Sequence, residues 1–139
     1  MKLLKINKAP FYIHIFFYIF FSFIKLKLIF NFYDLQTLLN EPKKEVKAIN
    51  SKKINADNLP KISHFISKFL GIKSCLINSI VLHKAFKKIN EKSSLHIGIV
   101  YKLEKFSSHA WVEFKGKEYV EGRSKNYKKL LEIIWMALA

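Results

Sequence analysis

The chain is 139 residues long, half of its residues are hydrophobic, and its formal net charge at pH 7 is +15. This length supports one domain with a single modest core, and the hydrophobic fraction excludes a disordered chain. Nearly all of the positive charge is lysine, and there is neither a basic run among aromatic residues nor a glycine-rich phosphate loop, so we expect no nucleic-acid partner.

The N-terminal segment is apolar and aromatic from Phe11 to Ile24, is interrupted by Lys25 and Lys27, and resumes from Leu28 to Tyr33. The uninterrupted run falls short of the roughly 20 residues that cross a bilayer. We therefore expect a helix packed on the domain. A helix on a membrane surface is one alternative, and a secretory signal without a small-residue cleavage site is another.

Three segments follow. Residues Asp34 to Asn40 predict a short helix, and Glu41 to Asn58 predict a lysine-rich linker whose charges face solvent. Pro60 in a first turn and Gly71 after a last turn delimit a third helix, with His64 on its solvent side. Its predicted buried face consists of Ile62, Phe65, Ile66, Phe69 and Leu70.

A fourth helix begins at Cys75, the only cysteine of the chain, with Ser74 suited to cap its N-terminus. Lys84, Lys87 and Lys88 are expected to face water. A single cysteine excludes an internal disulfide and a cysteine-rich metal site, and the sequence indicates no cofactor. A lone cysteine is usually a small buried residue, so its interpretation depends on the rest of the pattern.

From Leu95 to Leu103 the hydrophobic period changes to two, which predicts a strand, and His96 within it is expected to be structural. A second strand carries His109. The last segment, Asn126 to Ala139, has apolar residues at helical spacing and predicts a closing helix.

Cys75 and His109 together are suited to nucleophilic catalysis. A helix N-terminus and a nearby imidazole both lower the pKa of a thiol, and the imidazole can return the proton to a leaving amine. A carboxylate behind the imidazole would fix its tautomer. The order of cysteine, histidine and carboxylate resembles that of transglutaminase-like cysteine enzymes.

Three motifs, in order, carry a closer resemblance: Cys75-Leu76-x-x-Ser79, Ile97-Gly98-Ile99 and Phe106-x-x-His109-Ala110-Trp111-Val112-Glu113. Together they resemble the B2 proteins, which are the leader peptidases of lasso peptide biosynthesis. The resemblance implies that Cys75 is the nucleophile and His109 the base. The family has an aspartate as third member of the triad, and its position is occupied here by Glu121, with Glu113 and Glu118 as competitors.

The hairpin around Gly116 tests this triad. A three-residue loop at 115–117 would place Glu121 on the same face as His109, whereas a two-residue turn would place the two on opposite faces. The catalytic hypothesis therefore predicts the three-residue loop.

The expected fold is α+β, with a transglutaminase-like, papain-like core in which the Cys75 helix packs on a small antiparallel sheet after apolar N-terminal helices. We expect one domain, 1–139. Within it, 1–58 form the helical segment with the lysine-rich loop, and 59–139 form the catalytic core.

The resemblance also implies partners and a location. The partners are a precursor peptide with its leader, a separate leader-binding (B1-type) protein and an ATP-dependent macrolactam cyclase. The expected location is the cytoplasm, with peripheral membrane contact as an alternative. Another transglutaminase-like amidase or acyltransferase, and a catalytically silent basic membrane-associated protein, are the competing functions.

Overall fold

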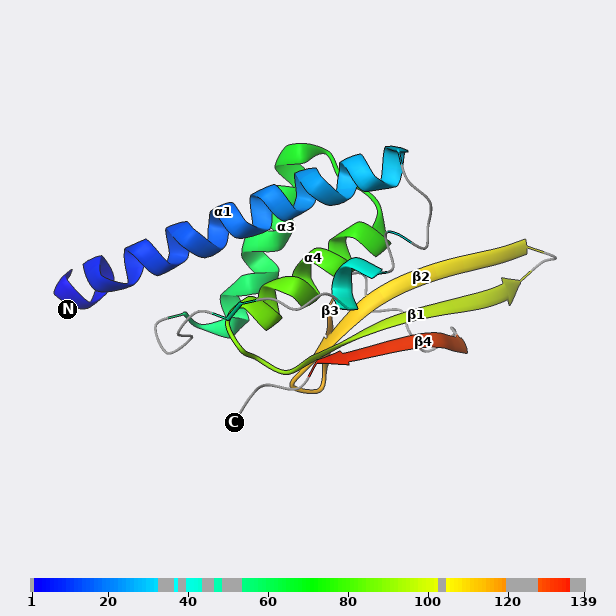
Figure 1. Ribbon diagram of the computed structural model, residues 1–139. Helices are drawn as coiled ribbons and strands as arrows, with labels where there is room; N and C mark the ends of the chain where they lie inside the picture. The colour runs from blue at the N-terminus through cyan, green and yellow to red at the C-terminus, as the bar shows by residue number, and fades with distance from the viewer. Residues whose placement is uncertain are drawn as a thin grey trace.

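The computed structural model describes residues 2–32, 37, 40–43, 47–48, 54–102, 105–119 and 128–135. In this part of the chain, helices α1 (Lys2–Phe32), α3 (Leu59–Leu70) and α4 (Cys75–Lys88) lie on one side of an antiparallel sheet (Figure 1). The sheet consists of β1 (Ser93–Lys102), β2 (Lys105–Phe114), β3 (Lys117–Tyr119) and β4 (Lys128–Trp135), in the order β3-β2-β1-β4. Two short 3-10 helices, η1 (Glu41–Lys43) and η3 (Ala56–Asn58), precede α3. The predicted α+β class is confirmed.

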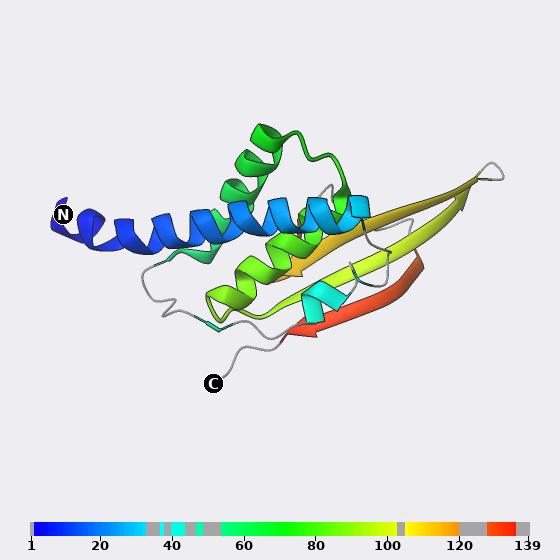
Figure 2. The same ribbon diagram turned by 45° about the horizontal axis from the view of Figure 1, so that its top comes forward.

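The N-terminal apolar segment forms one continuous helix, α1, which passes through Lys25 and Lys27 without a break. One side of α1 packs into the hydrophobic core, as predicted, and its fully buried members are Ile15, Ile19, Phe23 and Leu26. Within the described residues, Pro10–Phe32 is long and apolar enough to span a bilayer, with a mean hydropathy of 1.9 and one third of its window buried. Figure 2 shows α1 crossing in front of α3 and lying over α4.

Local sequence signals place the ends of the next two helices. Gly71 ends α3 with a left-handed φ of 68°, a conformation that glycine adopts without a side-chain clash. Ser74 caps α4, where its Oγ accepts a hydrogen bond from the Ile77 N–H at 3.3 Å. Both predictions are confirmed.

The predicted buried face of α3 is partly wrong. Ile66 is buried, but Phe65 and Phe69 are 63% and 75% exposed. Helical spacing identifies an apolar stripe but does not say how much of it a neighbouring helix covers.

The side of the sheet that faces α4 is set by the pleat. Leu95, Val112 and Phe114 belong to the hydrophobic core, and the Phe114 ring stacks on Phe86 of α4 with centroids 4.2 Å apart. Successive side chains on a strand point to opposite faces. The alternate residues, including His109, therefore lie on the face away from α4.

The predicted closing helix is wrong, because residues 128–135 form strand β4. This strand pairs antiparallel with β1, for example Leu131 with Ile97, and a register shift lies between Ile97 and Gly98. A short run of apolar residues is compatible with both the helical and the strand periodicity. Pairing with the open edge of β1 therefore decides that this segment forms a strand.

The linker between α1 and α3 is also more ordered at its start than predicted. Glu41 of η1 is 1% exposed, and its Oε2 lies 3.4 Å from Lys84 Nζ and 3.3 Å from Lys25 Nζ. Lys87 Nζ donates a hydrogen bond to the Pro42 carbonyl. Lys84 and Lys87 are thus buried under η1, and the prediction that they face water is wrong.

The predicted short helix at 34–40 lies mostly outside the described residues. Of its members, Thr37 and Asn40 are described, and both are helical.

Candidate active site

Cys75 is the first residue of α4 and is half-buried. The N–H groups of a first helical turn have no acceptors within the helix, and the helix dipole places partial positive charge there. The serine cap in the local sequence therefore places Cys75, the predicted nucleophile, at the positive end of α4.

Asn78 holds the loop that leads into Cys75. Its Nδ2 donates a hydrogen bond to the Ser74 carbonyl at 2.9 Å and lies 3.5 Å from the Ile72 carbonyl. No sequence motif assigns a role to Asn78, although its spacing of one helical turn from Ser74 favours this contact. Because its amide donates to backbone carbonyls, Asn78 is a positioning residue for the loop.

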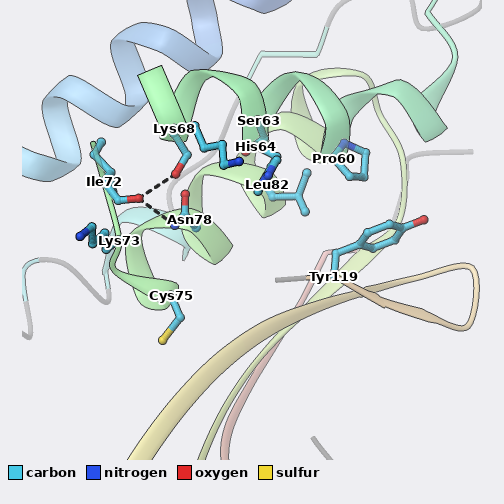
Figure 3. A pocket seen from close by; sticks show the side chains of 11 residues that line it. Pro60, Ser63, His64, Lys68, Ile72, Lys73, Cys75, Asn78, Leu82 and Tyr119 are labelled. Carbon is cyan, nitrogen blue, oxygen red and sulfur yellow. Dashed lines mark hydrogen bonds between the residues drawn. The ribbon is translucent and has the colours of Figure 1, made fainter. Parts of the chain in front are cut away.

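A pocket of about 580 Å³ adjoins Cys75 (Figure 3). It is formed by α3, the N-terminal half of α4 and Tyr119 of β3. Its polar lining includes His64, Lys68 and Lys73, so the pocket carries positive charge. The Cys75 sulfur points away from these three side chains, toward the strands of the sheet (Figure 3). His64 is exposed, as predicted, and its place in the same pocket as Cys75 was not foreseen, because α3 and α4 meet only in the tertiary structure.

His109 is buried on β2, and its ring stacks on Trp111 with centroids 5.8 Å apart. Trp111 in turn stacks on His96 at 5.4 Å, and His96 Nε2 lies 3.1 Å from Glu113 Oε2. The motif residues of β2 thus form an aromatic row on the outer face of the sheet. His96 is buried, and its structural role stays a prediction.

The described contacts do not include a hydrogen bond between Cys75 and His109. Helix α4 packs on the face of β2 that carries Val112, and the pleat directs His109 to the other face. His109 is also not among the residues that line the pocket beside Cys75. The catalytic roles of Cys75 and His109 stay predictions based on the motifs.

The predicted three-residue hairpin loop is wrong. Phe114 pairs with Lys117, so the turn has two residues, Lys115 and Gly116, with φ values of 50° and 76°. Positive φ at both central positions is typical of the tight turn that matches the twist of the two strands. The register that supported Glu121 is therefore absent, and Glu121 itself lies outside the described residues.

The two alternatives to Glu121 as the third member of the triad, Glu113 and Glu118, both lie in the described part of the chain. Glu113 contacts His96 on the outer face, and Glu118 is exposed on β3, paired directly opposite Glu113. Neither of them lines the Cys75 pocket.

A family model described as transglutaminase-like superfamily matches residues 27–134, which include α3, α4 and most of the sheet. No curated protein and no solved structure matches the chain. The match covers most of the sequence and includes both Cys75 and His109. The chain therefore belongs to the transglutaminase-like superfamily, which includes cysteine peptidases.

Proposed function

We propose that this protein is a cysteine peptidase that removes the leader from a ribosomally made lasso peptide precursor. The observation that carries the proposal is the position of Cys75, which is the first residue of a capped helix and lines a pocket large enough for peptide side chains. Membership of a superfamily that includes cysteine peptidases supports the hydrolytic chemistry. The motif resemblance supports the choice of substrate.

In the proposed reaction, the Cys75 thiolate attacks the scissile carbonyl carbon and a tetrahedral oxyanion forms. The amine leaves with a proton from the imidazolium, and the acyl group remains on sulfur as a thioester. Water then attacks the thioester while the imidazole takes its proton, which releases the carboxylate and restores the thiol. The Cys75 N–H is the first candidate donor to the oxyanion, because it needs no intrahelical acceptor.

Two histidines are candidates for the base. The motif assigns this role to His109, which must come within hydrogen-bond reach of the thiol in the competent state. His64 is the competitor, because it lines the same pocket as Cys75. The third triad member remains Glu121 by the resemblance.

The substrate class also agrees with the charge of the pocket. Lys68 and Lys73 line it, and a positive field draws acidic peptides toward a site. We infer that acidic residues of the precursor lie near these lysines. A separate leader-binding protein would deliver the leader, and an ATP-dependent macrolactam cyclase would close the ring of the released peptide.

The direct test is incubation of the protein with a precursor peptide and a leader-binding protein encoded beside it, followed by mass measurement of the products. Wild type should release the leader, and Cys75→Ala should abolish cleavage while circular dichroism stays unchanged. Cleavage retained by Cys75→Ala would end the catalytic assignment.

A second experiment measures the rate at which iodoacetamide alkylates Cys75 at about pH 6, well below the usual pKa of a thiol. An activated thiol should react faster than free cysteine. The base is then identified by His109→Ala and His64→Ala, of which only the variant lacking the base should slow alkylation at this pH. Wild-type alkylation no faster than that of free cysteine would favour a catalytically silent member of the superfamily.

A further inference from the structure

Large hydrophobic side chains are exposed on α1 and α3. Among the described side chains, those more than half exposed are Ile13, Phe17, Phe21, Leu28, Phe30, Phe32, Phe65 and Phe69. Single exposed hydrophobic residues need no explanation, whereas a contiguous aromatic patch marks a binding surface.

The exposed residues of α1 are organised by direction. Ile13, Phe17 and Phe21 follow each other at intervals of four residues, and Leu28 continues the same line. The buried residues Ile15, Ile19, Phe23, Leu26 and Ile29 lie on the opposite side of the helix. Helix α1 is therefore apolar on both sides, although only one side is covered by the domain, and a helix that is apolar all round is normally buried.

The exposed rings form a continuous surface. The rings of Phe17 and Phe21 stack with their centroids 6.2 Å apart. Phe16 packs edge-on against Phe17 with a centroid distance of 5.8 Å, and Phe20 packs edge-on against Phe21 with a centroid distance of 5.6 Å. An apolar groove of about 270 Å³ joins Phe16 and Phe20 to α3. We call this surface the aromatic face; it consists of Ile13, Phe16, Phe17, Phe20, Phe21, Leu28, Phe65 and Phe69.

The charges around the aromatic face indicate what covers it. The chain has a net charge of +15, and Lys27 on α1 and Lys61 and Lys68 on α3 are exposed on the same two helices. Lysines carry long apolar stems and can reach lipid phosphates while the aromatic rings enter the acyl boundary. An anionic lipid surface thus complements both the charge and the apolar character of these helices.

The structure also distinguishes lying on the membrane from spanning it. A spanning helix would expose its whole circumference to lipid, but the inner side of α1 is part of the domain core together with residues of α4. Only the outer side of α1 is available to lipid.

We propose that the aromatic face docks α1 flat on an anionic membrane surface, with its phenylalanine rings in the boundary between headgroups and acyl chains. Helix α3 would share this contact through Phe65 and Phe69, while His64 and Lys68 of the same helix line the Cys75 pocket. Docking therefore holds the pocket beside the membrane. This inference does not depend on the proposed peptidase activity.

Co-sedimentation of the full-length protein with lipid vesicles tests the docking. Vesicles of phosphatidylcholine mixed with phosphatidylglycerol should carry the protein down, and vesicles of phosphatidylcholine alone should carry down much less. High salt should weaken the binding to the anionic vesicles, because it screens the lysine charges. The variant with Phe17→Ser and Phe21→Ser should bind about tenfold more weakly, because two ring contributions to apolar burial are lost.

Phe30→Ser is the matched control. Phe30 is 53% exposed, close to the 51% of Phe17, but it points to a different side of α1. This variant should bind vesicles as wild type does, and circular dichroism checks that all variants are folded.

Three results would overturn the proposal. The first is no sedimentation of wild type with anionic vesicles. The second is equal binding by the Phe17/Phe21 double variant and Phe30→Ser. The third is concentration-dependent dimerisation that the double variant abolishes without any lipid binding, which would assign the aromatic face to a second copy of the chain.

Discussion

At the scale of single residues, His83 is a titratable group that is removed from water. It is fully buried on α4, and its Nδ1 lies 2.8 Å from the Ser93 Oγ of β1. Burial, aided by the positive charge of Lys87, lowers the pKa of His83 from 6.5 to about 3. His83 is therefore neutral in the folded protein and links α4 to the sheet, about 12 Å along the helix from Cys75.

This depressed pKa makes stability depend on pH. Below pH 6.5 the unfolded chain binds a proton at His83, whereas the folded protein binds this proton only near pH 3. The contribution of His83 to the free energy of unfolding is therefore complete above pH 6.5 and is lost as the pH falls toward 3. The slope from this group should be about 1.4 kcal/mol per pH unit between these values. Urea unfolding of wild type and His83→Gln at several pH values measures it, and identical pH slopes for the two proteins would contradict the prediction.

Gly116 gives a second prediction at this scale. Its φ is 76°, and a Cβ added there would meet no other atom within 4 Å, so the cost of Gly116→Ala is backbone strain alone. We expect a loss of about 1 kcal/mol in the free energy of unfolding. Lys117→Ala, an exposed substitution in the same hairpin, should change stability by less than about 0.5 kcal/mol. Equal effects of the two substitutions would mean that the turn does not need its left-handed residue.

At the scale of elements, η1 is joined to α4 and α1 by ion pairs of the buried Glu41 carboxylate. The Glu41 carboxylate lies within 3.4 Å of Lys84 Nζ and within 3.3 Å of Lys25 Nζ. Desolvation, followed by repulsion from Lys84, lowers the pKa of Lys87, whose Nζ donates to the Pro42 carbonyl. Charged side chains thus hold the segment after α1 to the domain, although the hydropathy pattern predicts that these side chains face solvent.

Glu41→Gln tests that arrangement. The substitution removes the carboxylate of the buried Glu41–Lys84 ion pair, and the expected loss of stability is about 3–5 kcal/mol. Glu118→Gln on the exposed face of β3 is the control and should stay within about 0.5 kcal/mol of wild type. Chemical denaturation of the three proteins compares them, and a Glu41→Gln midpoint equal to that of the control would show that η1 contributes no stability.

At the scale of the whole molecule, α1 is part of the single hydrophobic core. Phe23 has no exposed surface and belongs to the same cluster as Phe86 of α4 and Val112 of β2. An N-terminal secretory signal would be removable, whereas a core helix is required for folding.

Phe23→Ala should therefore destabilise the protein by about 3–5 kcal/mol, because it leaves a cavity in the core. Phe30→Ala, at a position near the end of the same helix that is 53% exposed, should cost less than about 1 kcal/mol. Thermal unfolding followed by circular dichroism measures both. Similar melting temperatures for the two variants would contradict the place of α1 in the core.

The sequence by itself determined the features that depend on neighbouring residues. The cap at Ser74, the end of α3 at Gly71 and the strand after Leu95 follow from local chemistry, because their hydrogen bonds and backbone conformations are made within a few residues. The motifs around Cys75 and His109 likewise indicated the transglutaminase-like superfamily, whose family model matches residues 27–134.

Only the tertiary structure decided which surfaces meet. Strand β4 forms because β1 offers an open edge, and Lys84 is buried because Glu41 folds back onto α4. The two-residue turn sets the register of β3, and the pleat of β2 turns His109 away from the helix that carries Cys75. These outcomes depend on contacts between segments that are distant in the sequence. Hydrophobic periodicity predicts which side of an element is apolar, but it does not predict which other element covers that side.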